Sequence, residues 1–103
     1  MNQQKTSENA LTDLVISRIK AENPRNQEIL TKLVKHLHAF VKEVAPTEAE
    51  WFSAIDFLTR TGKMCDDKRQ EFILFSDVLG VSMLVDAINH RTKTTVTETT
   101  VKG

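Results

Sequence analysis

Histidine and cysteine are the side chains of this sequence that could bind a metal ion. His36 and His38 stand two positions apart, and neutral imidazole is a common metal ligand. Residues two positions apart on a helix point in directions that differ by roughly 160°, so these two rings cannot hold one ion together. Cys65 and His90 could form half of a zinc site, but no further ligands stand at a recognisable spacing. The sequence therefore predicts no metal site in this chain.

Nucleophilic and acid–base chemistry has equally little support. Cys65 directly precedes Asp66 and Asp67, whose negative charge disfavours a reactive thiolate. The simpler role of these aspartates is to cap a helix and complement its dipole. Asp86 and His90 stand four positions apart and could pair on one helix face. There is no glycine-rich phosphate loop and no Gly-x-Ser-x-Gly or His-Glu-x-x-His motif. We therefore expect no catalytic residue in this chain.

Composition narrows the class of protein further. The 103 residues suit one domain, and 40% apolar with 27% charged residues is ordinary for a globular protein. Fourteen basic and fourteen acidic residues cancel, which argues against nucleic acid or a membrane surface as a partner. No signal peptide and no run of eighteen apolar residues is present, and one cysteine suits a reducing compartment. These features predict a cytoplasmic protein without a membrane span.

The spacing of apolar residues predicts an all-α fold of about five helices in a small bundle. We expect a disordered N-terminus over residues 1–6, then a helix that Thr6 or Ser7 caps and that ends near Glu22. Asn23 and Pro24 are suited to begin the second helix. That helix is the clearest element, runs to Val44 and would be roughly 30 Å long.

Three shorter helices follow in this interpretation. Thr47 and Glu50 form a capping-box pattern for the third helix, which we expect Gly62 to end through a left-handed residue. Phe57 points away from the apolar face of this helix, which indicates contacts on two sides. Asp66 or Asp67 would cap the fourth helix, which is apolar all round, is therefore expected to be buried, and ends at Gly80. The fifth helix is predicted from Ser82 to His90, so the helical domain spans residues 7–90.

The last thirteen residues differ in character from the rest of the chain. Residues 91–103 are rich in threonine with interspersed valine, which favours an extended strand or linker. An isolated strand has nothing to pair with in a helical domain. We therefore expect this segment to lead into a β domain that the chain does not contain.

The first two helices carry more apolar surface than a five-helix core needs. Ordinary core packing is one explanation, and a self-complementary dimer surface or a groove for an acyl chain are the others. The predicted dimer and lipid face comprises Leu11, Val15, Ile29, Leu33, Leu37 and Phe40.

From about Ile29 to Val101 the sequence resembles the N-terminal helical domain of the intradiol ring-cleavage dioxygenases, the hydroxyquinol and catechol 1,2-dioxygenases. The matching segments are LVKHLHAF (33–40), EW leading to IDFLTRTG (50–62), CDDKRQEF (65–72), SDVLGVSMLVDAINH (76–90) and TETTV (97–101). The residues of these segments are more similar to the hydroxyquinol branch, although the catechol branch remains an alternative.

The resemblance implies an enzyme that splits an aromatic diol with a non-haem Fe(III), held by two tyrosines and two histidines in a following β-sandwich. It also implies a homodimer formed through the N-terminal helices, with a phospholipid or fatty-acyl ligand at the junction. Met83 and Asp86 would lie at the rim of the substrate pocket in a full-length parent.

This chain has no tyrosine and stops at Gly103. We therefore expect a dimerisation and lipid-holding domain that holds no cofactor and is not an enzyme by itself. The alternatives are a fragment of a full-length ferric dioxygenase, or an unrelated helical module that binds proteins or nucleic acid.

Overall fold

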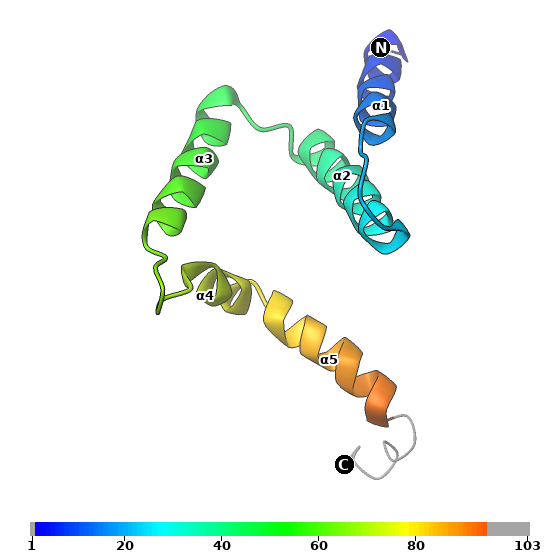
Figure 1. Ribbon diagram of the computed structural model, residues 1–103. Coiled ribbons are helices and arrows are strands. Elements are labelled where there is room, and N and C mark those ends of the chain that lie inside the picture. Colours follow the sequence, from blue (N-terminus) through cyan, green and yellow to red (C-terminus); the bar gives the residue numbers. More distant parts are fainter. Residues whose placement is uncertain (1, 95–103) are drawn as a thin grey trace. The chain divides into compact units, whose positions relative to one another are not determined.

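The computed structural model describes the backbone of residues 2–94 and the side chains of residues 7–90. Five α-helices and no strand lie in this part of the chain, which confirms the predicted all-α fold (Figure 1). The contacts divide the chain into two compact units, residues 1–49 and residues 50–103.

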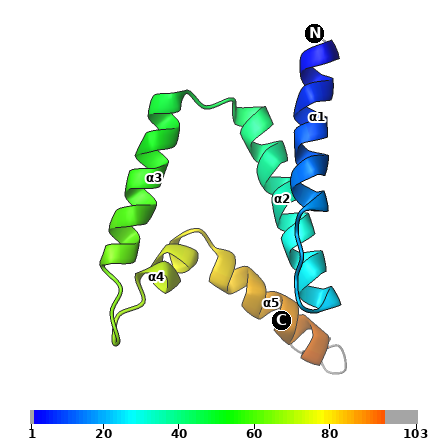
Figure 2. The same ribbon diagram turned by 45° about the horizontal axis from the view of Figure 1, so that its top comes forward.

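Unit 1 is a hairpin of two helices, α1 (Asn2–Ser17) and α2 (Pro24–Val44), which lie side by side (Figure 2). The predicted bounds of α2 are confirmed. The side-chain oxygen of Asn23 accepts a hydrogen bond of 2.8 Å from the Asn26 amide, and Pro24 occupies the first turn, where no amide hydrogen is needed. At its other end Ala45 is left-handed, with φ of 50°, and donates its amide hydrogen to Val41.

The predicted bounds of α1 were wrong at both ends. The helix begins at Asn2, ahead of the cap expected at Thr6 or Ser7, because the glutamines and lysine that follow Asn2 are good helix formers. It ends at Ser17 rather than near Glu22. The Gln27 side chain accepts from the Ala21 amide (2.9 Å) and donates to the Ile19 carbonyl (3.0 Å). The Ala21 amide and the Ile19 carbonyl lie between the two helices, and these bonds give them the partners that a helix would otherwise supply.

Helices α1 and α2 meet along a half-buried flank rather than along the most apolar face of α2. The half-buried residues of α2 on this flank are Gln27, Thr31, Val34 and His38. The apolar stripe, which we define as Ile29, Leu33, Leu37, Phe40 and Val44, remains between 47% and 58% exposed. At 3.6 residues per turn the centres of the flank and the apolar stripe lie roughly 130° apart around the helix. The hairpin therefore leaves the main apolar surface of α2 uncovered.

Unit 2 contains most of α3 (Glu48–Lys63) together with α4 (Glu71–Val78) and α5 (Val81–Thr94). The expected left-handed stop at Gly62 was wrong, because the helix continues to Lys63 and Gly80 is the glycine with positive φ. Helix α3 closes through a tighter turn in which the Met64 and Cys65 amides bond to the Thr61 and Gly62 carbonyls. The predicted break at Gly80, where φ is 79°, is confirmed.

The ends of α4 and α5 also differ from the prediction. Gln70, not Asp66 or Asp67, precedes α4, and it makes no side-chain capping bond. Asp66 instead accepts from the amides of Lys68 and Arg69, both at 2.8 Å, in a turn ahead of the helix. Residues 91–94 continue α5 where an extended linker was expected, and the rest of the predicted tail lies outside the described residues.

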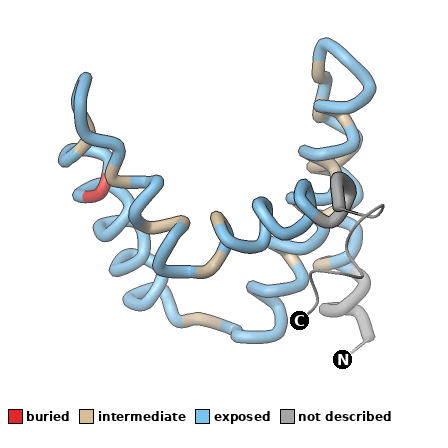
Figure 3. Tube along the Cα trace, turned by 90° about the horizontal axis from the view of Figure 1, so that it is seen from below, coloured by how far each residue is buried: buried red, intermediate tan, exposed pale blue. Residues whose placement is uncertain are grey.

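Burial is low throughout the described side chains. Thr61, 6% exposed, is the one buried residue among them, and no apolar side chain in this range is buried (Figure 3). Helix α4, expected to be buried because it is apolar all round, has no buried residue, since α3 and α5 cover only part of it. Large apolar side chains that stay this exposed are the mark of a binding or assembly surface.

Candidate functional site

A groove between α1 and α2 is the candidate site in unit 1. Its volume is about 540 Å³, within the range of ligand-binding clefts. The lining residues are Glu8, Leu11, Thr12, Leu37, His38, Val41, Lys42, Ala45 and Pro46. Aliphatic side chains from both helices form its apolar part, and a few polar groups complete it. The groove can therefore accommodate an aliphatic ligand that carries a polar end.

Two hydrogen bonds between the helices fix the polar side of this groove. The hydroxyl of Thr12 lies 2.6 Å from Nδ1 of His38, and Lys42 donates to the Asn9 side-chain oxygen at 2.9 Å. The partner of the Lys42 ammonium is thus a neutral amide, and the lining of the groove carries both this ammonium and the carboxylate of Glu8.

The predicted dimer and lipid face separates into three parts in the structure. Leu11 and Leu37 come together in the groove, and Leu37 belongs to the apolar stripe as well. Val15 is half-buried on α1, beside the hairpin flank. Ile29, Leu33 and Phe40 belong to the exposed apolar stripe of α2. The sequence analysis placed all six residues on one surface. The spacing of apolar residues does not show which flank of a helix packs against the neighbouring helix and which flank stays exposed.

Unit 2 contains a second, smaller cavity that the sequence analysis missed. Its volume is about 290 Å³, and it lies between α3 and α4. The lining residues are Phe57, Arg60, Thr61, Met64, Glu71, Leu74, Phe75 and Val78. The rings of Phe57 and Phe75 meet edge to face, with centroids 5.1 Å apart, which agrees with the expected contact of Phe57 away from the apolar face of α3. The off-face position of Phe57 was the available signal for this cavity.

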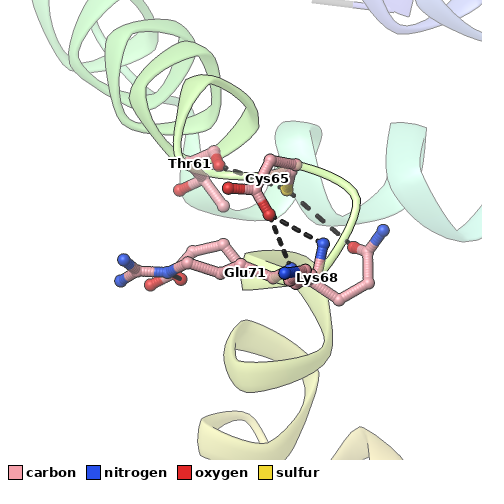
Figure 4. A network of polar contacts seen from close by, with 7 residues as sticks. Thr61, Cys65, Lys68 and Glu71 are labelled. Atoms are coloured by element: carbon pink, nitrogen blue, oxygen red, sulfur yellow. Dashed lines mark hydrogen bonds and ion pairs between the residues drawn. The ribbon is translucent and has the colours of Figure 1, made fainter.

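The loop between α3 and α4 holds the only cysteine in a network of polar contacts (Figure 4). The half-buried Cys65 thiol lies 3.5 Å from the Thr61 carbonyl and 3.9 Å from the Gln70 side-chain oxygen. Arg69 donates to Glu71 at 2.8 Å, and this hydrogen bond raises the pKa of the guanidinium. The contacts of Cys65 are those of a thiol that stabilises a loop.

The two predicted rim residues lie on α5. Met83 is 75% exposed, and Asp86 pairs with His90 through Oδ1 and Nδ1 at 2.9 Å. The predicted pairing of Asp86 with His90 is confirmed. Met83 stands one turn before Asp86, so both residues belong to the same side of the helix.

The histidines of α2 do not converge. His38 faces Thr12, whereas His36 is exposed on another side of the helix. Among the described side chains, those of residues 7–90, no group of three or more His, Cys, Asp or Glu lies close enough together to hold a metal ion. No described helix is long and apolar enough to cross a membrane.

Fold and site together define an all-α helical domain with an open groove and exposed apolar faces. Residues 23–97 match the family model described as the catechol dioxygenase N terminus. The chain therefore belongs to this family, the helical N-terminal domains of intradiol ring-cleavage dioxygenases.

Curated relatives and a solved structure agree with this membership. The chain is 54% identical to 6-chlorohydroxyquinol 1,2-dioxygenase of Cupriavidus pinatubonensis over 97% of this chain and 37% of the relative. It is 53% identical to hydroxyquinol 1,2-dioxygenase of a Rhizobium strain, over 88% of this chain and 31% of the relative. It matches a crystal structure of hydroxyquinol 1,2-dioxygenase from Pseudomonas putida with a TM-score of 0.80 and 57% identity, over 84% of this chain and 31% of that chain. The chain thus spans about a third of the length of these proteins.

Proposed function

We propose that this chain is the dimerisation and acyl-ligand-binding domain of an intradiol dioxygenase that acts on hydroxyquinol-type substrates, and that it is not catalytic by itself. The observation that carries the proposal is the apolar stripe of α2, which its own hairpin leaves about half exposed. The two relatives named above carry hydroxyquinol in their names, which supports that branch over catechol. We further propose a cytoplasmic location, which the single cysteine supports.

Dimerisation is supported by the amount and the shape of the exposed apolar surface. The five residues of the apolar stripe repeat at three- and four-residue intervals, the spacing that lets two helices pack along their length. Burying the exposed half of each side chain contributes roughly 1 kcal/mol. A second copy of the chain offers the same surface, so the contact between two copies is self-complementary about a two-fold axis.

An acyl ligand is supported by the groove beside the apolar stripe. Leu11, Leu37 and Val41 supply aliphatic contacts, and Lys42 supplies a positive charge at the same site. A phospholipid or fatty acid combines these two chemistries, because its chain is aliphatic and its head group is anionic. We therefore expect the polar head near Lys42 and the acyl chain along the leucines.

Sedimentation of the purified chain at micromolar concentration tests the assembly. We expect a dimer, and we expect extraction with organic solvent followed by mass spectrometry to recover a lipid. A monomer that carries no lipid contradicts this part of the proposal, and it would mean that the helices of one chain cover the apolar stripe themselves.

Catalysis by the parent protein is a separate part of the proposal. The Fe(III) site that the resemblance implies needs two tyrosines, and this chain has none, so its residues do not fit that ligand set. We therefore place the ring cleavage in the remaining two thirds of a longer polypeptide.

A fusion of this chain to the remaining part of the Cupriavidus enzyme tests that placement. The fusion should be coloured, contain iron and cleave hydroxyquinol, whereas the 103-residue chain should be colourless and inactive. Ring cleavage by the chain alone contradicts our reading of the absent tyrosines. A folded fusion that is inactive contradicts the assignment to a dioxygenase.

A further inference from the structure

The apolar stripe of α2 has two flanks of different chemistry. At 3.6 residues per turn, the charged flank lies roughly 60–100° to one side of the stripe. We define it as Arg25, Lys32, His36 and Glu43. The apolar flank lies roughly 60–80° to the other side, and we define it as Leu30 and Val41, which are 40% and 45% exposed. A helix that packs on the stripe therefore meets charged side chains along one edge and aliphatic side chains along the other.

The charge of the charged flank changes sign along the helix. Arg25 and Lys32 stand in its N-terminal half, whereas Glu43 stands near its C-terminal end. The Lys32 ammonium lies 3.3 Å from the Glu28 carboxylate of its own helix and its side chain is 67% exposed, so it can contact a second carboxylate. Glu43 is exposed, and among the described side chains the structure gives its carboxylate no ion pair.

Two copies of the chain can bring their stripes together in two symmetric ways. If the two α2 helices run parallel, the two-fold axis runs along them, and the charged flank of each copy meets the apolar flank of the other. If they run antiparallel, the axis is perpendicular to both helices, and each flank meets its own counterpart. The parallel arrangement desolvates charged side chains against Leu30 and Val41, whereas the antiparallel arrangement joins apolar flank to apolar flank.

The antiparallel arrangement also brings opposite charges together. The stripe is centred midway between Leu33 and Phe40, so Glu43 of one copy lies level with Leu30 of the other. Lys32 of that other copy is two residues further along, about 3 Å at 1.5 Å per residue, which its long side chain can span. The two-fold axis produces this contact twice. In a parallel pair Lys32 and Glu43 would be roughly 16 Å apart along the helices and could not meet.

We propose that the two α2 helices of the dimer pack antiparallel, with Lys32 of each copy paired to Glu43 of the other. The inference rests on the proposed function, which makes the apolar stripe the dimer contact. It adds the direction of the helices and the residues that determine it. Charge pairs at the edge of an interface fix orientation more than they add affinity. The apolar stripe thus supplies the attraction, and the Lys32–Glu43 pairs select one of two orientations.

Distances between spin labels on the purified 103-residue chain measure the direction of the helices. Cys65→Ser removes the native thiol, and Arg25→Cys then places one label near the start of α2 in each copy. Antiparallel helices separate these labels by roughly 35 Å along the axis, whereas parallel helices bring them within roughly 20 Å. His36→Cys, near the centre of the stripe, is the matched control and should give a short distance in either arrangement.

The outcomes separate the inference from the proposed function. A dimer with a short distance from both labels contradicts the antiparallel packing and leaves the proposed function intact. A monomer, or a dimer with a long distance from His36→Cys, contradicts both, because the apolar stripe is then not the contact between the two copies.

Exchange of the two charges tests the pair itself. Glu43→Lys sets lysine against lysine, so we expect the dimer Kd to rise about tenfold in sedimentation equilibrium. Adding Lys32→Glu restores opposite charges, and Kd should return to within about threefold of the original value. Adding Lys35→Glu gives the same net charge on the other side of α2 and should not restore it. Circular dichroism shows whether each variant keeps its helices. Equal recovery with Lys32→Glu and with Lys35→Glu would make the effect one of net charge, and the proposed pair would be wrong.

Discussion

The pair α1–α2 of unit 1 and the pair α3–α4 of unit 2 are held together by different contacts. In unit 1 the contacts between α1 and α2 include polar bonds, from Thr12 to His38 and from Asn9 to Lys42. In unit 2 the contact between α3 and α4 is aromatic, through Phe57 and Phe75. Polar bonds between helices fix their register without using much apolar surface.

This difference explains which surface each unit leaves for binding. The hairpin uses a flank that contains a glutamine, a threonine and a histidine, and so the apolar stripe of α2 stays open as one continuous surface. Unit 2 uses part of its apolar surface internally and leaves the remainder distributed over α3, α4 and α5. A continuous apolar stripe can pack along a helix of a second copy, whereas exposed apolar side chains that are spread over several helices suit smaller contacts.

The largest effect should come from charges placed on the apolar stripe. The double substitution Leu33→Asp and Leu37→Asp puts two carboxylates on the proposed dimer surface, where they would be desolvated against their symmetry mates. We expect the dimer dissociation constant to rise at least about 100-fold in sedimentation equilibrium. Lys35→Asp, on the other side of α2, is the control and should leave the dimer intact. A double variant that still dimerises like the original would mean that the apolar stripe is not the interface.

Loss of the aromatic contact should affect unit 2 alone. Phe75→Ala removes the edge-to-face partner of Phe57 and enlarges the cavity between α3 and α4, so we expect a loss of about 2 kcal/mol in the free energy of unfolding. Trp51 is the only tryptophan and lies on α3, so its fluorescence in urea reports on unit 2. Phe40→Ala, in unit 1, is the matched control. An unchanged urea midpoint for Phe75→Ala would show that the ring pair does not hold α3 to α4.

The bounds of α2 could be predicted from sequence because local chemistry sets them. Asn23 and Pro24 act within one turn of the helix start, and the 21 residues that follow have a strong helical repeat. The ends of α1 and α4 could not be predicted in the same way. After α1, the Gln27 side chain bonds to the Ile19 carbonyl, which lies eight residues earlier in the chain. Before α4, the Asp66 carboxylate accepts a hydrogen bond within a turn and does not cap the helix.

Like the helix bounds, the candidate sites could be predicted where they depend on the residues of a single helix. Pairs on a single helix, such as Asp86 with His90, follow from the spacing of four residues. The groove in unit 1 depends on which flanks of α1 and α2 meet, and the cavity in unit 2 depends on the angle at which α3 meets α4. Neither orientation is encoded within one helix, so the sequence named Leu11 and Leu37 but not the polar groups beside them.

A smaller effect is expected at the start of α2. Asn23→Ala removes the side-chain oxygen that accepts from the Asn26 amide, and the loss of such a cap costs about 1 kcal/mol. The change should lower the thermal unfolding midpoint followed by circular dichroism, whereas Asn23→Asp, which keeps an acceptor, should not. If Asn23→Ala and Asn23→Asp unfold at the same temperature, the cap does not stabilise the hairpin.

The smallest expected effect concerns the exposed ion pairs of α2. Hydrogen bonds from Arg25 (3.1 Å) and then from Lys32 (3.3 Å) lower the pKa of Glu28 below its ordinary value. Because the pKa in the folded state lies below that of the unfolded chain, the stabilisation is present above the unfolded pKa and is lost as the pH falls through the folded pKa. Glu28→Gln should therefore be slightly less stable than the original at pH 7 and equally stable in acid near pH 3. Raising the salt concentration at pH 7 should narrow the difference, because exposed charges are screened. A difference between the two proteins that persists unchanged in acid would assign the effect to side-chain packing rather than to charge.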